Sequence, residues 1–364
     1  MEFRIEREKI LGLVDHVEGI VEKRNTIPIL SNILIDAEGD SIAVTATDLD
    51  IVVRDKISGV DVVQQGKITV GASTFSALIR KMPASSLIEM SVADGRMAIK
   101  SGRIRYQIPV LPADDFPLGQ PTQGEDCEFK IDNMVSAFKL IRESMSTEET
   151  RYYLNGAYLA IENGDLVAVS TDGHRLGIAK IAETGIDAPN AIVPRKAVNH
   201  LIKILPGFEG EVTVRIDNRS IEFEAGDLLF HSKLIDGTFP DYTRVIPSNE
   251  DVVIKVDPQL LQQAIERVSI VTVEKTSAIK LVVEKDKITI IANSPDTGSA
   301  QEEVAAESTK EITVGYNSSY LKDILSGYSG CKTVTISLGN ETSPALIRPD
   351  NSDVNRSVLM PMRI

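Results

Sequence analysis

The sequence predicts an α+β protein built from three repeated units, each with two helices packed on antiparallel sheets. Three observations support this fold class. The chain has 364 residues, which is too long for one ordinary domain. Three sets of strand and helix patterns recur in the same order at nearly equal spacing. Stretches rich in Gly, Pro and acidic residues separate the copies.

Each copy opens with a short alternating strand that runs into an amphipathic helix. These segments begin at Phe3, Phe129 and Ile254. In the third copy, Asp257 before Pro258 predicts an N-cap followed by the first helical turn. The apolar positions at helical spacing, which we expect to be buried, are Ile10, Leu13, Val14 and Val17, then Met134, Val135, Phe138 and Ile141, then Leu260, Leu261, Ile265 and Val268.

A second marker is a strand that ends in a polar turn. Asp48, Asp172 and Ser294 occupy the same place in the three copies, 124 and 122 residues apart. A third marker is another strand followed by a second helix. The strands of these three segments begin at Ile68, Ala191 and Ile312. Each copy then continues in alternating strands such as "VTVRIDNRSIEFEAG", whose Gly and Asn turns favour hairpins.

The copies are separated by "PLGQPTQGED" from Pro117 and "PSNED" from Pro247. We therefore expect domains at residues 1–120, 127–246 and 251–364. The chain ends on the apolar stretch Ser357–Ile364, although chain ends are usually polar unless something ties them down. Its place in the repeat predicts a terminal strand of the third unit.

Composition limits the class of protein. Hydrophobic residues make up 42% of the chain and charged residues 25%, as in globular proteins. The longest apolar stretches are about half the roughly 20 residues of a membrane span. The N-terminus "MEFRIEREK" lacks the apolar core of a secretory signal, so we expect a cytoplasmic protein. Cys127 and Cys331 lie in no CxxC motif, which indicates reduced thiols and neither a zinc site nor a disulfide.

The formal net charge is −14, which on average repels nucleic acid and anionic lipid. The net charge of the whole chain does not determine the charge of any single face of the protein.

Four segments carry a resemblance to a known family: "RYYLNG" from Arg151, "TDGHRL" from Thr171, "FPDYTRVIP" from Phe239 and the final "MPMRI". With the threefold repeat, the chain resembles the bacterial DNA polymerase III beta subunit family, the processivity sliding clamps. The resemblance covers essentially the whole chain. It implies domains of the DNA-clamp type and a head-to-tail homodimer that closes a ring of six domains around duplex DNA. A ring that holds DNA by enclosure needs few basic contacts, so an acidic exterior can coexist with it.

The resemblance implies that the clamp tethers the replicative polymerase and confers processivity in DNA replication, with no catalysis, cofactor or metal of its own. Its expected partners are duplex DNA without sequence preference, the DNA polymerase III alpha subunit, the clamp loader, and other polymerases and repair proteins that bind through short linear motifs. The expected DNA-contacting residues are Arg24, Tyr152, Tyr153, Arg195 and Lys196. For Arg24 and Lys196 the alternative is that they are ordinary solvated surface charges.

One departure from the family pattern concerns the loop before Arg151. It carries Glu148 and Glu149, where family members often have polar or basic residues, and this puts DNA contact by the loop in doubt.

The resemblance also implies a peptide-binding groove. Methionine suits such a surface because its flexible, polarizable side chain adapts to different apolar motifs. The apolar chain end would thus be a docking surface. The expected groove residues are Leu154, Thr171, Gly173, His174, Arg175, Leu176, Pro240, Arg244, Val245, Pro344, Val358, Met360, Pro361, Met362 and Arg363.

A third implied site is the dimer interface, where an unpaired edge strand invites pairing with a second chain. Arg103, Arg105, Tyr106 and Ile108 of one copy would meet Ile270, Val271, Glu302 and Glu303 of the other. The alternative is that Tyr106 and Ile108 pack inside their own sheet.

Two other function classes stay open at this point. Ser170, Asp172 and His174 are the residue types of a hydrolytic triad, but they are crowded into five positions without a G-x-S-x-G elbow. If the protein were a hydrolase that uses His174, a His174→Ala variant would lose the hydrolytic activity. The alternative for His174 is a partly buried histidine satisfied by backbone groups. A repeat protein serving as a static scaffold or adhesin is the other class.

Overall fold

The structure is a computed structural model that describes residues 1–22, 27–183, 190–272, 277–350, 352 and 354–363. The chain divides into two compact units. The first comprises Met1–Ile131 with Lys203–Leu234, and the second comprises Asp132–Ile202 with Ile235–Ile364. Within the described ranges, no helix is both long enough and apolar enough to cross a membrane.

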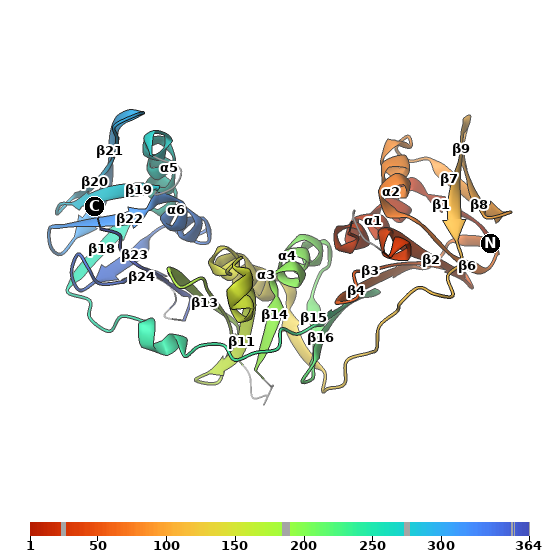
Figure 1. Cartoon of the computed structure of the whole chain (residues 1–364), viewed down its shortest axis with the longest axis horizontal. Coiled ribbons are helices and arrows are strands. Elements are labelled where there is room, and N and C mark those ends of the chain that lie inside the picture. Colours follow the sequence, from red (N-terminus) through yellow and green to blue (C-terminus); the bar gives the residue numbers. More distant parts are fainter. Residues whose placement is uncertain (23–26, 184–189, 273–276, 351, 353, 364) are drawn as a thin grey trace. The chain divides into compact units, whose positions relative to one another are not determined.

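All three predicted strand–helix openings are present (Figure 1). They are β1 (Glu2–Glu6) with α1 (Arg7–Val17), β10 (Cys127–Lys130) with α3 (Ile131–Ile141), and β18 (Val252–Val256) with α5 (Pro258–Val268). The predicted helix faces are buried with one exception. Leu260 is 51% exposed, so its prediction was wrong. The buried face of α5 runs through Leu261, Ile265 and Val268 at helical spacing, and Leu260 lies about 100° away from it.

The second helix of each copy follows its predicted strand. The pairs are β6 (Gly66–Gly71) with α2 (Ala72–Lys81), β14 (Ala191–Pro194) with α4 (Arg195–Ile204), and β22 (Ile312–Asn317) with α6 (Ser318–Ser326). Within the described residues, α5 and α6 begin with the same kind of cap. The Asp257 side chain accepts hydrogen bonds from the backbone N–H groups of Gln259 and Leu260, as predicted, and Asn317 caps α6 in the same way.

The three polar turns are closed by one hydrogen-bonding pattern. They connect β3 (Ser41–Thr47) to β4 (Ile51–Ile57), β12 (Asp165–Thr171) to β13 (Arg175–Glu183), and β20 (Lys287–Ser294) to β21 (Gly298–Ser308). In each turn the side-chain oxygen of Asp48, Asp172 or Ser294 accepts from the backbone N–H groups two and three residues later. The predicted equivalence of these three positions is confirmed.

Among the described residues, the first unit carries one 13-stranded antiparallel sheet in the order β10-β15-β16-β17-β4-β3-β2-β6-β9-β8-β7-β1-β5. Its remaining strands are β2 (Asn32–Glu38), β5 (Asp61–Gln64), β7 (Leu87–Ala93), β8 (Arg96–Ser101), β9 (Ile104–Leu111), β15 (Glu211–Ile216), β16 (Ser220–Ala225) and β17 (Leu228–Lys233).

The second unit carries a 12-stranded sheet within the same described ranges, in the order β14-β11-β12-β13-β25-β24-β23-β18-β21-β20-β19-β22. Its remaining strands are β11 (Gly156–Glu162), β19 (Ala278–Val283), β23 (Val334–Leu338), β24 (Ala345–Pro349) and β25 (Arg356–Leu359). Short 3₁₀ helices include Pro28–Ser31 before β2, Glu149–Leu154 before β11 and Tyr242–Val245 before β18.

Successive repeats are joined by the same kind of strand pair. In the first unit β4 pairs with β17, and in the second unit β13 pairs with β25. In both joints the fourth strand of one repeat lies antiparallel to the last strand of the next. Each sheet therefore continues across a repeat boundary, with the backbone N–H and C=O groups of both strands satisfied.

Apart from the end strands of the two sheets, β9 and β21 each keep part of one edge unpaired within the described residues. β9 pairs with β8 from Ile104 to Pro109 on one side, and with β6 only at Val110 and Leu111 on the other. β21 pairs with β20 from Gly298 to Ala305, and with β18 only further along. These two are the last strand of the first repeat and the fourth strand of the third repeat.

The chain end forms a strand only as far as Leu359. Beyond it, the Met360 N–H donates to the His174 carbonyl at 2.9 Å and the Met362 N–H donates to the Gly315 carbonyl at 2.8 Å. The tail is therefore tied down by backbone hydrogen bonds after its strand has ended.

We predict that Asp257→Ala lowers the stability of the protein by about 1 kcal/mol, because two N–H groups of the first turn of α5 lose their acceptor. Glu6→Ala is the matched control, since Glu6 occupies the N-cap position of α1 without a side-chain capping bond. Calorimetry should show a lower melting temperature for Asp257→Ala than for Glu6→Ala. Equal melting temperatures would contradict the capping role.

Candidate functional site

The turn between β12 and β13 packs against α6 in the second unit. The Arg175 guanidinium carbon lies 4.4 Å from the centroid of the Tyr320 ring. Its Nε donates to Asp172 at 3.1 Å and its Nη1 to Asp323 at 2.8 Å. A cation held over an aromatic face by two carboxylates is a rigid arrangement. Arg175 thereby ties the turn to α6.

His174 lies next to this arrangement. Its ring stacks on Tyr320 with the centroids 5.9 Å apart, and its side chain is exposed. The alternative that His174 is partly buried and satisfied by backbone groups was therefore wrong. A stacked, exposed imidazole can contact a ligand with its edge. Tyr320 and Asp323 were not predicted, because only the packing of α6 on the turn brings them here.

An apolar floor lies beside this turn. Leu154, Leu176 and Val358, all predicted groove residues, belong to one buried cluster with Phe239 and Leu346. Leu346 was not predicted, although it lies two residues after the predicted Pro344. Its place follows from the strand pairing, because Leu346 lies opposite the predicted Val358.

The chain end borders the same turn through the hydrogen bond of Met360 to His174. Met360 and Arg363 are exposed, and Pro361 and Met362 are half-buried. The structure thus brings these tail residues together with His174, Arg175 and Leu176. Thr171 and Gly173 complete the turn, where the Gly173 N–H donates to the Thr171 hydroxyl oxygen at 3.1 Å.

The segment after Phe239 supplies the other predicted residues. Phe239 stacks on Tyr158 with the ring centroids 4.7 Å apart. Pro240, Arg244 and Val245 follow it and are exposed. The Arg244 Nε donates to Asp241 at 2.8 Å, so this cation is engaged within its own short helix. No recorded contact within the described residues joins Arg244 to the turn at His174.

Side chains of the second unit do not form a hydrolytic triad. Ser170 is fully buried, and its hydroxyl donates to the Ile141 carbonyl at 2.5 Å. The Asp172 carboxylate accepts from backbone groups and from Arg175. Neither is placed to activate the other, so this alternative is not supported. In the described part of the chain, no group of three or more His, Cys, Asp or Glu side chains could hold a metal ion.

The residues expected near DNA fall on two neighbouring elements. Tyr152 is exposed and Tyr153 half-buried on the 3₁₀ helix before β11, with their rings edge to face at 5.8 Å. Arg195 and Lys196 open α4, and the Arg195 Nη1 donates to the Met145 carbonyl at 3.3 Å. Arg24 lies outside the described residues. Because Arg195 is held by the segment before the 3₁₀ helix, the two elements are linked.

Only some of the side chains expected at the dimer interface are exposed to solvent. Ile270 is 80% exposed and Tyr106 39% exposed, but Ile108 is 7% exposed opposite the buried Met97. For Ile108 the alternative, packing inside its own sheet, is therefore what the structure shows. Val271 is half-buried and Arg103 is exposed.

Three of the four charged residues of this set, namely Arg105, Glu302 and Glu303, already have partners within the chain. The Arg105 Nη1 donates to the carbonyls of Gly102 and Ile104. Glu302 binds Arg267 at 2.5 Å, which lowers the pKa of that carboxyl, and Glu303 binds Lys287 at 2.8 Å. Any ion pair with a second copy would have to be shared with these contacts.

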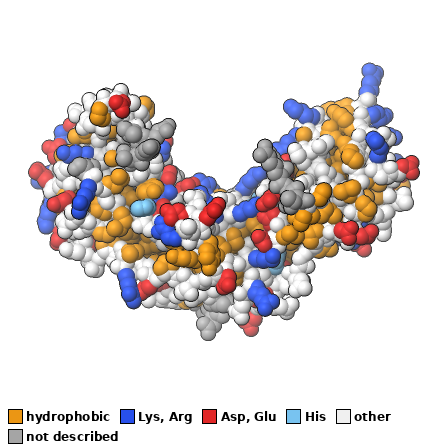
Figure 2. Space-filling view, viewed as in Figure 1, with side chains coloured by type: hydrophobic (Ala, Val, Ile, Leu, Met, Phe, Trp, Pro, Cys, Tyr) orange, Lys and Arg blue, Asp and Glu red, His pale blue; other side chains and the backbone are white. Residues whose placement is uncertain are grey.

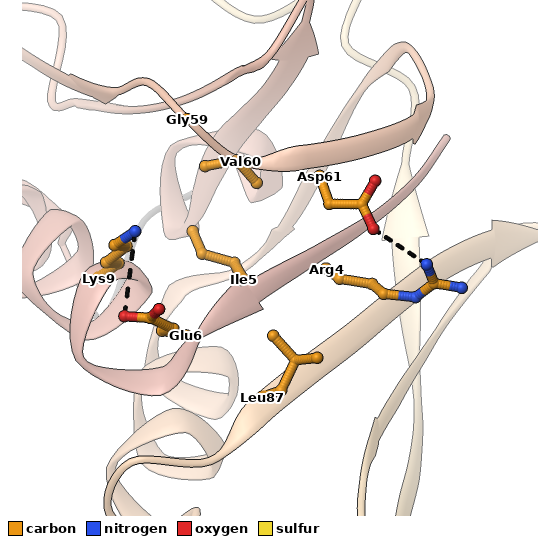
Figure 3. Close-up of a pocket in the computed structure, with 8 residues that line it drawn as sticks. All are labelled: Arg4, Ile5, Glu6, Lys9, Gly59, Val60, Asp61 and Leu87. Carbon is orange, nitrogen blue, oxygen red and sulfur yellow. Dashed lines mark hydrogen bonds and ion pairs between the residues drawn. The ribbon is translucent and has the colours of Figure 1, made fainter.

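Hydrophobic side chains gather in patches on one face of the molecule, among scattered charges (Figure 2). A separate pocket of about 190 Å³ lies in the first unit between β1, the start of β5 and Leu87 (Figure 3). Ile5 and Val60 line it, and its charges pair internally, with Arg4 2.9 Å from Asp61. It contains none of the predicted site residues.

Comparison with known proteins places these features in a family. Three family models match the chain, described as the N-terminal, central and C-terminal domains of the DNA polymerase III beta subunit. They cover residues 1–120, 128–241 and 243–363. Among curated relatives, the beta sliding clamps of Caulobacter vibrioides and Escherichia coli K12 are 37% and 34% identical, with all of each chain covered.

Solved structures agree with this assignment. A DnaN sliding clamp from Bartonella birtlesii bound to griselimycin is 39% identical, with a TM-score of 0.94 over all of both chains. A DnaN sliding clamp from Pseudomonas aeruginosa, also bound to griselimycin, is 34% identical with a TM-score of 0.93, again over all of both chains.

Proposed function

The chain belongs to the DNA polymerase III beta subunit family, the bacterial sliding clamps, and from this we propose how its surfaces serve the function of a clamp. A clamp is an accessory processivity subunit and not an enzyme; it works with DNA and DNA polymerase. The observation that carries the proposal is the repeat itself, since three copies joined by equivalent strand pairs leave one such fourth strand, β21, and one such last strand, β9, without their partner.

The proposed domains are residues 1–120, 127–246 and 251–364. We propose that two copies close head to tail into a ring of six such domains. The fourth strand of one repeat pairs with the last strand of the next in both observed joints. The unpaired edges of β21 and β9 are the two strands that this rule would join. A heterologous contact of this kind closes a ring when its rotation is a divisor of a full turn.

The repeat also supplies a register for this third joint. The first residue of the fourth strand, Ile51 or Arg175, lies opposite Ser232 or Leu359 of the last strand. Ser232 is the fifth residue of β17 and Leu359 the fourth of β25, and we take the register of the first joint. Gly298 opens β21, and Ile108 is the fifth residue of β9. The joint would then place Gly298 opposite Ile108 and Gln301 opposite Arg105 of the second copy. In this register the backbone, and not the buried Ile108 side chain, makes the contact.

Duplex DNA would be held by enclosure, with few phosphate contacts. Phosphate contacts carry no sequence information and weaken with salt, so a mobile clamp needs only a few of them. We propose that Tyr152, Tyr153, Arg195 and Lys196 lie near the duplex, together with Arg24. A net charge of −14 is compatible with this, because the charge elsewhere does not have to attract DNA.

We further propose that the turn at Thr171–Arg175, the apolar floor and the chain end form one groove for short linear motifs. The DNA polymerase III alpha subunit, the clamp loader and other polymerases and repair proteins would share it, in the cytoplasm. A buried floor of Leu154, Leu176 and Val358 beside the exposed Met360 suits a Leu or Phe side chain. Such a small patch implies affinities in the micromolar range.

Enclosure has a topological test. The clamp, loaded on nicked circular DNA by a clamp loader, should stay bound through gel filtration and dissociate once the circle is cut. A protein that merely adheres to DNA would be retained equally on both forms. Equal retention would overturn the proposal that the ring encloses DNA.

We predict that deletion of Met360–Ile364 abolishes binding of a fluorescein-labelled peptide with adjacent Leu and Phe residues, because the groove loses one border. Fluorescence anisotropy measures the affinity. Retention on circular DNA is the control and should be unchanged, since the tail follows the last strand. Unchanged peptide affinity after the deletion would exclude the tail from the groove.

The proposed register predicts a disulfide between Arg105→Cys of one copy and Gln301→Cys of the other, in a chain with Cys127 and Cys331 replaced by Ser. Oxidation should link most dimers, as seen on a non-reducing gel. The control places the second cysteine one residue further, at Glu302→Cys, whose side chain points to the opposite face of β21. Ile270→Asp should shift sedimentation toward the monomer. Failure of both the cross-link and this shift would refute the proposed joint.

A further inference from the structure

The acidic loop before the 3₁₀ helix is engaged with an arginine of that helix. The Glu148 carboxylate oxygen Oε2 accepts a hydrogen bond from the Arg151 Nε at 2.9 Å and forms an ion pair with its Nη2 at 2.7 Å. The bond to Glu148 also raises the pKa of Arg151. A charge-assisted hydrogen bond with a second close nitrogen orients the guanidinium toward this carboxylate.

The backbone of the loop holds Glu148 in place. Its N–H donates to the Ser146 hydroxyl oxygen at 3.1 Å, and its carbonyl accepts from the Arg151 N–H and from the Asn155 side chain, both at 3.2 Å. Arg151 itself has φ −114° and ψ 51°, outside the helical region. The carboxylate and the arginine are therefore presented by a hydrogen-bonded loop.

The third nitrogen of Arg151, Nη1, points at the turn of the proposed groove. It lies 2.9 Å from the position that a Cβ atom on Gly173 would occupy. No recorded hydrogen bond within the described ranges uses Nη1. The guanidinium therefore covers the backbone of Gly173 and keeps one donor group available beside His174.

The first repeat provides an internal comparison. Leu49 occupies the equivalent position, with φ +80° against +89° for Gly173. Its N–H donates to Thr47 at 3.0 Å, as that of Gly173 donates to Thr171 at 3.1 Å. A side chain is thus compatible with this turn. We attribute the glycine at position 173 to the close approach of Arg151, more than to the positive φ alone.

We propose that Glu148 is a positioning residue of the peptide groove, which holds Arg151 against Gly173 so that its Nη1 can donate to an acceptor oxygen of the bound peptide. This inference rests on the proposed groove. It assigns the acidic loop, which departs from the family pattern on the side expected to face DNA, to peptide recognition. Glu149, the next carboxylate, has no recorded bond to Arg151 and serves as its natural control.

The experiment measures the affinity of the labelled Leu-Phe peptide for full-length dimers by anisotropy. The variants are Glu148→Gln, Glu149→Gln, Arg151→Met and the double variant Glu148→Gln/Arg151→Met. We expect Glu148→Gln to weaken binding by about threefold to tenfold and Glu149→Gln to leave it unchanged. In the Arg151→Met background, Glu148→Gln should change the affinity by less than about twofold, because its effect requires Arg151.

Melting temperatures and retention on circular DNA are measured for every variant. A general structural role for Glu148 would lower the melting temperature and persist without Arg151, and this result would overturn the inference. So would unchanged peptide affinity of Glu148→Gln accompanied by longer retention on DNA, which would assign the carboxylate to DNA repulsion. If the unmodified protein does not bind the peptide, the groove proposal itself fails; if only the Glu148 effect is missing, the groove proposal stands.

Discussion

The antiparallel strand pair between successive repeats is the interaction on which the rest of the structure depends. β4 with β17 and β13 with β25 continue a sheet from one repeat into the next, so two repeats share backbone hydrogen bonds and buried side chains. The pair also brings the polar turn of one repeat beside the segment that follows the last strand of the next. Because each joint uses the fourth strand of one repeat and the last strand of the next, a chain of three repeats has one of each left over.

The same backbone frame gives different surfaces at the two joints. In the first, the Lys233 N–H donates to the Asp50 carbonyl at 2.8 Å; in the second, the Met360 N–H donates to the His174 carbonyl at 2.9 Å. The Lys233 ammonium pairs with the Asp50 carboxylate at 3.0 Å, so the first joint is bordered by an ion pair. The second is bordered by an exposed methionine and an imidazole stacked on Tyr320. Side-chain identity on a shared frame thus decides which joint offers an apolar surface.

The ion pairs near the sites of this molecule act on single arginine side chains. Acidic side chains outnumber basic ones, 53 to 39, yet the carboxylates near the sites are engaged in named contacts. Asp172 and Asp323 hold Arg175, Glu148 holds Arg151, and Glu302 holds Arg267. An exposed ion pair contributes little to stability. Its effect here is to orient a guanidinium relative to a turn, a helix or a free strand edge.

The sequence alone determined the threefold order of elements, because hydrophobic periodicity, capping residues and turn chemistry depend on neighbours a few positions away. It identified the Asp257 cap, the three equivalent turns and nearly all of the buried helix faces. Only the tertiary structure decided that Leu260 is exposed, that Ile108 is buried, and that Tyr320 and Asp323 meet Arg175. These outcomes depend on how elements far apart in the sequence pack and in which register their strands pair. A periodic pattern shows which side of an element is apolar, but not which partner covers it.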